Sequence, residues 1–129
     1  MVAGIGPAPA QGRSEPRLFV CEIRTAQELA ADGGFEATPY TRLLLEPGVR
    51  LTFDERSGRL GRELPTGPLA TRRFLVVQRG GERTDLVARQ ISSPSSPPHD
   101  VLRIVVTNPA MPFLYLDGDA VITGSCIAE

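Results

Sequence analysis

The sequence predicts one mainly antiparallel β domain of the α+β class, either a single sheet with short helices on one face or a small β-barrel. The main observation is the segment 72–91, in which the apolar runs 74–77 and 86–88 flank the pair Gly80-Gly81. Glycines with positive φ between two such runs are typical of a tight β-hairpin. A second hairpin is predicted around Asp117-Gly118, since Asp-Gly is a strong turn signal.

Length and composition fit one globular domain. The chain has 129 residues, of which 41% are hydrophobic and 22% charged. Residues 1–16 are rich in Gly, Pro and Ala, so we expect a flexible tail there and the single β-rich domain over residues 17–129. No apolar run approaches the roughly 20 residues of a membrane-spanning helix, and the N-terminus does not resemble a signal peptide. We therefore expect a cytoplasmic protein with no membrane partner.

The first part of the domain is predicted to contain a strand and a helix. Residues 17–24 have the composition of a strand, with Leu18 and Val20 in the core. The sequence Thr25-Ala-Gln-Glu28 matches a capping box, which predicts a short helix over residues 26–32. Gly33-Gly34 would end this helix.

A second helix is predicted to start at Thr38-Pro39, because proline is well tolerated at the first helical position. The segment 40–45 is also short enough to be a strand, although we favour the helix. Next, Val49, Leu51 and Phe53 alternate with polar residues, which is the period of a half-exposed strand. A returning strand is expected over residues 60–64.

The last third of the chain begins with a connection rich in Ser and Pro over residues 92–100, which we interpret as a linker or a lid. Residues 101–107 read as a buried strand, with a helix capped by Asp100 as the alternative. Residues 113–116 and 120–127 would form the second hairpin.

The two cysteines, Cys21 and Cys126, are expected to be buried and reduced, as is usual in a cytosolic protein. If the first and last strands were neighbours, a disulfide between them would be geometrically allowed. Neither cysteine has a neighbouring histidine or a Cys-x-x-Cys partner, so a metal site and redox catalysis lack support.

Motifs for catalysis and cofactors are missing from the sequence. The one histidine, His99, lies among prolines with only Asp100 nearby, and Ser125 lacks the pattern around a catalytic nucleophile. The segment 117–119 lacks the further ligands of a calcium loop. We therefore expect no metal and no cofactor, and we leave the catalytic residues unknown.

The net charge and the kind of basic residue bear on the class of partner. The net charge is −1, which argues against nucleic acid as a partner. All 14 basic residues are arginine, which reflects either GC-rich coding or a need for planar guanidinium groups that hold carboxylates. Because neighbours on a strand face opposite sides, one of Arg72 and Arg73 must point to the covered face. There it would meet a protein carboxylate, Glu63 or Glu82, or the carboxylate of a ligand.

Part of the chain resembles the chorismate lyase and UTRA-like superfamily. The resemblance rests on three segments: residues 73–92, in which an arginine opens the strand and Ala88 takes a small-residue position; residues 43–48; and residues 108–114, where the family's Pro-Leu-Gly loop lacks its glycine. It implies an antiparallel sheet with helices on one face, a buried site and Arg73 as a carboxylate ligand. The chain ends before the family's last arginine and its glutamate-bearing strand, so the resemblance implies ligand binding more than lyase catalysis.

We therefore predict a small-molecule binding protein or lyase-like enzyme that acts on an anionic cyclic carboxylate, with Arg73, Arg89 and Arg103 as ligand-binding residues. One alternative is a cofactor-free β-barrel cyclase of a natural-product (polyketide) pathway, which needs little more than a shaped pocket. Another is a protein–protein interaction module that uses an exposed sheet edge at residues 60–64. Pairing through such an edge would also allow a homodimer. Whether the protein is an enzyme stays open at this point.

Overall fold

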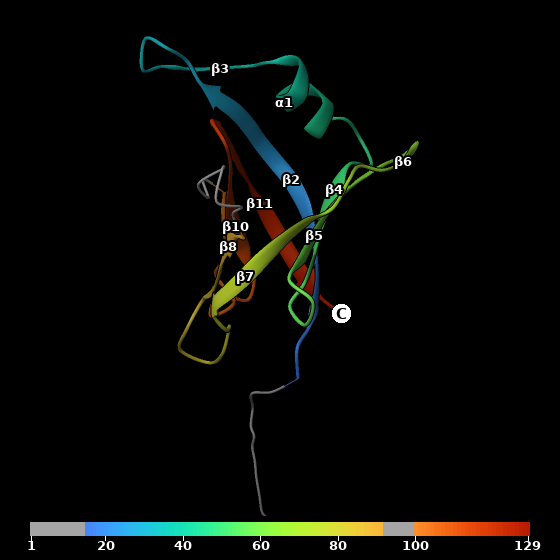
Figure 1. The fold of residues 1–129 in the computed structure, drawn as a ribbon, viewed down its shortest axis with the longest axis vertical. Helices are drawn as coiled ribbons and strands as arrows, with labels where there is room; N and C mark the ends of the chain where they lie inside the picture. The colour runs from blue at the N-terminus through green and yellow to red at the C-terminus, as the bar shows by residue number, and fades with distance from the viewer. Residues whose placement is uncertain (1–14, 92–99) are drawn as a thin grey trace, which may run out of the picture.

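Eight antiparallel strands form a closed barrel in the computed structural model, which describes residues 15–91 and 100–129 (Figure 1). The barrel strands, in chain order, are β2 (Leu18–Leu29), β4 (Arg50–Asp54), β5 (Arg59–Leu64), β7 (Arg72–Gln78), β8 (Leu86–Gln90), β9 (Val101–Ile104), β10 (Pro112–Asp117) and β11 (Ala120–Ala128). Each strand pairs with the next, and β11 pairs back with β2. The sequence left open whether the strands form a single sheet or a small barrel, and the structure shows a barrel.

The barrel is nearly all sheet, so the expected helices on one face are not found among the described residues. Two short strands, β3 (Phe35–Glu36) and β6 (Gly67–Pro68), pair with β2 and β5. The one helix in the described part is α1 (Pro39–Leu44), which lies at one end of the barrel (Figure 1). Its start confirms the prediction, because Thr38 caps it and Pro39 follows. Thr41 and Leu44 of α1 are buried against the barrel.

The predicted helix over residues 26–32 is wrong, because these residues continue strand β2 as far as Leu29. β2 pairs with β11 over nine residue pairs, and the register shifts at Thr123/Gly124. The hydroxyls of Thr25 and Thr123 form a hydrogen bond across the two strands. The ladder with β11 supplies backbone hydrogen bonds along nearly the whole length of the strand, whereas a capping box stabilises only a helix end.

The central hairpin is confirmed as the pair β7–β8, but its turn is not tight. Seven residues, 79–85, connect the strands, and neither Gly80 nor Gly81 has a positive φ. The loop is closed instead by backbone and side-chain bonds between Thr84 and both Arg79 and Gly81. Gly80 is needed for space, because a Cβ there would lie 2.7 Å from Val106 Cγ2.

The remaining strands follow the expected order. β4 and β5 form the expected pair, and residues 101–104 form strand β9 in place of the alternative helix. β10 and β11 form the second hairpin, with Gly118 at a φ of 61° in its turn. β5 lies between β4 and β7, so the expected free edge at residues 60–64 is wrong. The predicted flexible tail falls mostly on residues 1–14, and His99 and most of the proline-rich connection on residues 92–99, outside the described residues.

The barrel interior is filled by alternate side chains of the strands. Phe74 of β7 makes edge-to-face contacts with Phe53 of β4 and Tyr115 of β10, at ring-centroid distances of 6.3 and 6.0 Å. Neither β4 nor β10 is a neighbour of β7 in the sheet, so these rings meet across the interior. The core is therefore enclosed by the barrel wall.

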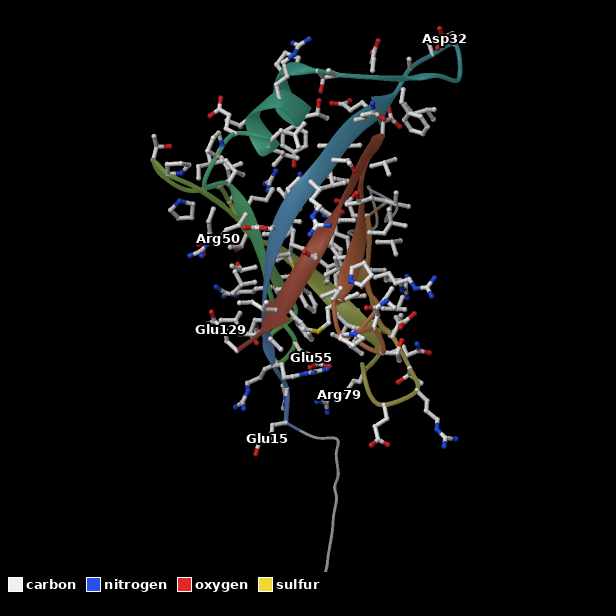
Figure 2. All side chains as sticks on the ribbon, turned by 180° about the vertical axis from the view of Figure 1, so that it is seen from behind. Glu15, Asp32, Arg50, Glu55, Arg79 and Glu129 are labelled. Carbon is white, nitrogen blue, oxygen red and sulfur yellow. A yellow bond between two sulfur atoms is a disulfide. The ribbon has the colours of Figure 1, made fainter. Side chains whose placement is uncertain are left out.

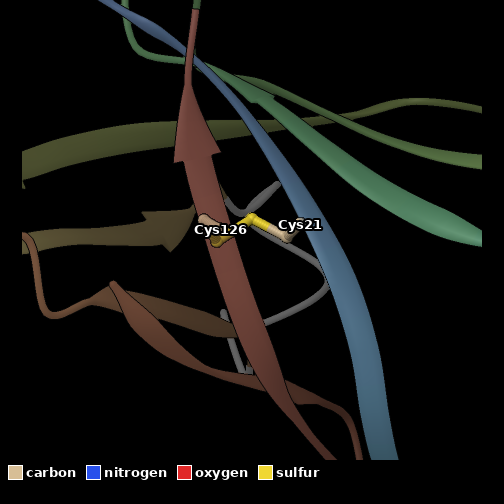
Figure 3. The surroundings of a disulfide bond; sticks show 2 residues. All are labelled: Cys21 and Cys126. Atoms are coloured by element: carbon tan, nitrogen blue, oxygen red, sulfur yellow. A yellow bond between two sulfur atoms is a disulfide. The ribbon is translucent and has the colours of Figure 1, made fainter. Parts of the chain in front are cut away.

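The expectation of two reduced cysteines is wrong, because Cys21 and Cys126 form a disulfide (Figure 3). The two residues are direct partners in the ladder between β2 and β11, with their Cα atoms 3.9 Å apart. The condition for pairing, that the first and last barrel strands are neighbours, is met by barrel closure. Within the described ranges, no helix has the length and apolar character needed to cross a membrane.

Candidate functional site

Charged and hydroxyl side chains gather inside the barrel at the end that α1 covers. Strand alternation turns them inward: Arg62 follows Leu60 on β5, Arg72 precedes Phe74 on β7, and Asp117 follows Tyr115 on β10. Asp100 stands immediately before β9, and Tyr40 reaches in from α1. We call this set of Tyr40, Arg62, Arg72, Asp100, Tyr115 and Asp117 the polar cluster.

Arg72 joins the two aspartates of the polar cluster. Its Nη1 lies 2.5 Å from Asp100 Oδ2 and 2.5 Å from Asp117 Oδ1. The aspartate side chains are only 5% and 8% exposed, whereas the side chain of Arg72 is 30% exposed. Asp100 is held further by the backbone N–H of Gly118, which donates to Oδ1 at 2.9 Å. Arg72 thus neutralises buried carboxylates and still reaches solvent.

Tyr40 connects Asp117 to the second arginine. Its hydroxyl donates to Asp117 Oδ2 at 2.5 Å and accepts from Arg62 Nη1 at 3.0 Å. The guanidinium of Arg62 also lies over the Tyr40 ring, with Cζ 5.9 Å from the ring centroid. A continuous hydrogen-bonded chain therefore runs from Arg62 through Tyr40 and Asp117 to Arg72.

Arg62 is the least compensated charge of the polar cluster. The residue is 9% exposed, and no carboxylate among the described residues forms an ion pair with it. Its Nη2 donates to the backbone carbonyl of Ala70 at 3.1 Å. Its Nε is buried and finds no hydrogen-bond acceptor within the described part of the chain. Such a donor is costly to bury, because it loses water without gaining a partner.

Burial and the two aspartates keep the tyrosines of the polar cluster neutral. Burial, followed by the hydrogen bond to Asp117, raises the pKa of Tyr40 to about 12, although Arg62 opposes this. Burial and the nearby Asp117 also raise the pKa of Tyr115. Burial alone would lower the pKa of Arg72, but Tyr115, Asp117 and Asp100 raise it overall. Near neutral pH the site therefore offers the charged guanidinium of Arg72 and two hydroxyl groups that keep their protons.

The three arginines expected to bind the ligand lie on the outer wall of the barrel. Arg73, Arg89 and Arg103 are all exposed, and they sit on the neighbouring strands β7, β8 and β9. Arg103 is paired with Asp85, with Nη2 2.6 Å from Oδ2. The structure therefore places these three on one face but outside the polar cluster. Arg72, the neighbour of Arg73, is the inward arginine, and its partners are Asp100 and Asp117 in place of the expected Glu63 or Glu82.

Arg62 also carries a strand-period signal, but the signal does not single it out, because Arg89 and Arg103 each lie between two apolar residues in the same way. Arg62 lies between Leu60 and Leu64 at the period of two that marks one face of a strand, so it shares their apolar face. No comparable signal marks Asp100 or Tyr40. Asp100 precedes β9 and Tyr40 belongs to α1, so only the closed barrel brings them together with Arg62.

Two other features of the barrel compete with the polar cluster as sites. The buried Glu55 at the opposite end of the barrel pairs with Arg79, with Arg79 Nε 3.3 Å from Glu55 Oε2 (Figure 2). A cavity of about 650 Å³ is lined mainly by β2, β4, β5 and β11, including Val20, Glu22, Arg50, Glu63 and Ile127. In that cavity Arg50 and Glu63 form an ion pair that is about half exposed. We favour the polar cluster over the cavity because its charges are buried at a free-energy cost. We favour it over Glu55 because that carboxylate is compensated by Arg79 and by the backbone N–H of Arg17, whereas the Nε of Arg62 finds no acceptor among the described residues.

No group of His, Cys, Asp and Glu side chains within the described ranges has the arrangement of a metal site. Comparison with models of known protein families, with curated proteins and with solved structures finds no match to this chain. The resemblance to the chorismate lyase and UTRA-like superfamily thus stays a prediction. The site has to be interpreted from its own chemistry.

Proposed function

We propose that the protein binds a small, partly apolar organic carboxylate inside the α1 end of the barrel, held by Arg62 and Arg72. The observation that carries this proposal is Arg62, a buried guanidinium with no carboxylate partner and with a buried Nε donor that no described residue satisfies. A buried arginine of this kind is strongly unfavourable unless an anion meets it. The carboxylate of a ligand supplies that anion.

Arg72 offers the second contact. All its hydrogen bonds to described residues come from Nη1, so the edge formed by Nε and Nη2 stays available for a carboxylate. Such an edge suits two parallel hydrogen bonds to the two oxygens of a carboxylate. The neighbouring residues Phe74 and Tyr115 are 3% and 0% exposed, so their rings offer the apolar part of the ligand a surface only after a covering side chain has moved.

The test is a binding series with benzoate, 4-hydroxybenzoate and chorismate on the wild type, Arg62→Met and Arg73→Met. A ligand at about a hundred times its Kd adds roughly 2.7 kcal/mol to the stability of the folded state, which raises the Tm by several degrees. We expect this rise in the wild type and in Arg73→Met and not in Arg62→Met, with calorimetric titration confirming the loss.

Two outcomes contradict the proposal. If no carboxylate binds the wild type, the polar cluster is not a carboxylate site. If binding survives in Arg62→Met and is lost in Arg73→Met, the ligand is held on the outer wall by Arg73, the arginine that the family resemblance names.

A second candidate function, a cofactor-free barrel cyclase or lyase, is favoured by the closed barrel and by the chemistry of the polar cluster. Asp100 and Asp117 lie beside the hydroxyls of Tyr40 and Tyr115, so groups that accept and donate protons share one buried site. An enzyme of this kind would convert a bound substrate, and Asp117→Asn would bind it without converting it. Recovery of every bound compound unchanged from the wild type argues for binding alone.

A further inference from the structure

We propose that Tyr40 occupies the place of a hydroxyl-bearing ring of the ligand, and that α1 is a lid which carries Tyr40 out of the barrel when that ligand enters. The ligand class would then be a hydroxylated aromatic or similarly flat cyclic acid. This inference rests on the proposed function and deepens it, because it names the group beside the carboxylate that the site recognises.

The contacts of Tyr40 are those that a phenolic ligand would make. One hydroxyl both donates to Asp117 and accepts from Arg62, and the ring beneath Arg62 supplies a face for the guanidinium. Asp117 only accepts and Arg62 only donates, so the pair selects a group that does both. A neutral hydroxyl on a flat ring meets this requirement. A ring without a hydroxyl would leave Asp117 and Arg62 each without one hydrogen bond.

Access to the polar cluster also involves Tyr40. The Nε of Arg62 is completely covered, so no ligand atom reaches it unless a neighbouring side chain moves. Tyr40, which lies against Arg62, is only half-buried and belongs to a six-residue helix. Exposed residues precede α1 at 31–37 and follow it at 45–48, with Gly48 at a φ of 85°. Short elements between such connections are typical of lids.

The contacts that hold α1 down set the cost of opening. Leu44 and Thr41 are 1% and 0% exposed, and the Thr38 hydroxyl donates to Glu28 of β2 at 2.6 Å. Replacing the Tyr40 hydroxyl by a ligand hydroxyl conserves the hydrogen bonds of Asp117 and Arg62. The free energy of opening and binding then depends on two terms. The loss of these α1 contacts is unfavourable, and the gain of contacts with the ligand's carboxylate and ring is favourable.

The first experiment compares 4-hydroxybenzoate with benzoate on the wild type and on Tyr40→Phe. We expect 4-hydroxybenzoate to bind at least about tenfold more tightly, because only it restores both hydrogen bonds. Tyr40→Phe removes the competing hydroxyl and keeps the ring, so it weakens the closed position of α1. The affinity for 4-hydroxybenzoate should then rise about five- to tenfold. If the role of Tyr40 were purely structural, the same substitution would lower the affinity or leave it unchanged.

A second measurement is made on the protein with its wild-type sequence, and a variant is needed only to assign the signals. The chain contains two tyrosines and no tryptophan, so incorporation of 3-fluorotyrosine gives two ¹⁹F signals, which Tyr40→Phe assigns. We expect 4-hydroxybenzoate to move the Tyr40 signal to the position of a solvent-exposed tyrosine, with a smaller change at Tyr115.

The outcomes separate this inference from the proposed function. Binding that depends on Arg62, with equal affinity for both benzoates and an unmoved Tyr40 signal, overturns the lid and keeps the carboxylate site. Reduced affinity in Tyr40→Phe also overturns the lid. The absence of any carboxylate binding, in the wild type and in Tyr40→Phe alike, overturns both.

Discussion

The two inward arginines of the polar cluster differ in what neutralises them. Arg72 stands between two buried aspartates, so its removal leaves two carboxylates without a cation. Arg62 contacts only the neutral Tyr40 hydroxyl and the carbonyl of Ala70. Removing one partner of a buried ion pair is strongly destabilising, whereas replacing an uncompensated charge by an apolar group of similar volume is often neutral or stabilising.

Substitution by methionine should therefore affect the two arginines differently. We expect Arg72→Met to lower the free energy of unfolding by about 2–3 kcal/mol, which is below the usual range for a fully buried pair because Arg72 is 30% exposed. Arg62→Met should leave it unchanged or raise it by up to about 3 kcal/mol, because the cost of burying an uncompensated charge is removed. Urea unfolding measures both values. A loss in Arg62→Met as large as that in Arg72→Met would show that Arg62 is compensated within the protein, which would weaken the proposed function.

Among the elements, the pairing of β2 with β11 closes the barrel. The ladder contains an irregularity at Thr123/Gly124, where the register skips Arg24 on β2. Gly124 lies directly against the backbone of β2, because a Cβ built there would be 1.8 Å from the carbonyl oxygen of Glu22 and 2.8 Å from Phe113 Cε1. This position accepts only glycine for reasons of space, in the manner of glycines at bulges and tight bends of barrel strands.

Gly124→Ala should consequently destabilise the barrel by about 3 kcal/mol or more, because backbone and a packed ring must both move. The measurement is the Tm together with the urea midpoint. Gly81→Ala is the matched control, since its nearest contact would be Thr84 Oγ1 at 3.4 Å and its φ is not positive. It should shift stability by less than about 1 kcal/mol. Equal effects of the two substitutions would show that the close approach of β2 to β11 does not restrict position 124 to glycine.

For the whole molecule, the disulfide fixes the same pair of strands covalently. Cys21 and Cys126 are 105 residues apart in sequence, so the bond restricts nearly the entire unfolded domain. Eight of the nine residue pairs between β2 and β11 do not include these cysteines, so the barrel should remain closed without the bond. Disulfides persist in oxidising compartments and are rare in the cytosol, which stands against the expected cytoplasmic location.

The double substitution Cys21→Ala and Cys126→Ala should lower stability by about 4 kcal/mol and leave the far-ultraviolet circular dichroism unchanged. Wild type treated with a reductant should behave in the same way. Alkylation of thiols in intact cells before lysis gives the state of the pair in the cell. We expect no modified cysteine unless the protein is first reduced and unfolded. Two readily alkylated thiols in native protein would contradict the disulfide.

The sequence by itself determined the local elements of this protein. Alternation predicted β4, Thr38-Pro39 predicted the start of α1, and Asp117-Gly118 predicted the second hairpin. These signals succeed because strand period, helix capping and turn geometry depend on a few neighbouring residues. The same alternation showed that one of Arg72 and Arg73 must point inward, but local pattern does not say which.

Only the tertiary structure decided that the sheet closes, and closure decided the rest. Pairing with β11 makes residues 26–29 of the predicted helix part of a strand, and it brings Cys21 and Cys126 together. It also selected Arg72 over Arg73 and assembled a site from residues 40 to 117, which no local pattern connects. The physical reason is that ladder hydrogen bonds and burial act between residues distant in sequence, and their summed free energy outweighs the preference of any short segment.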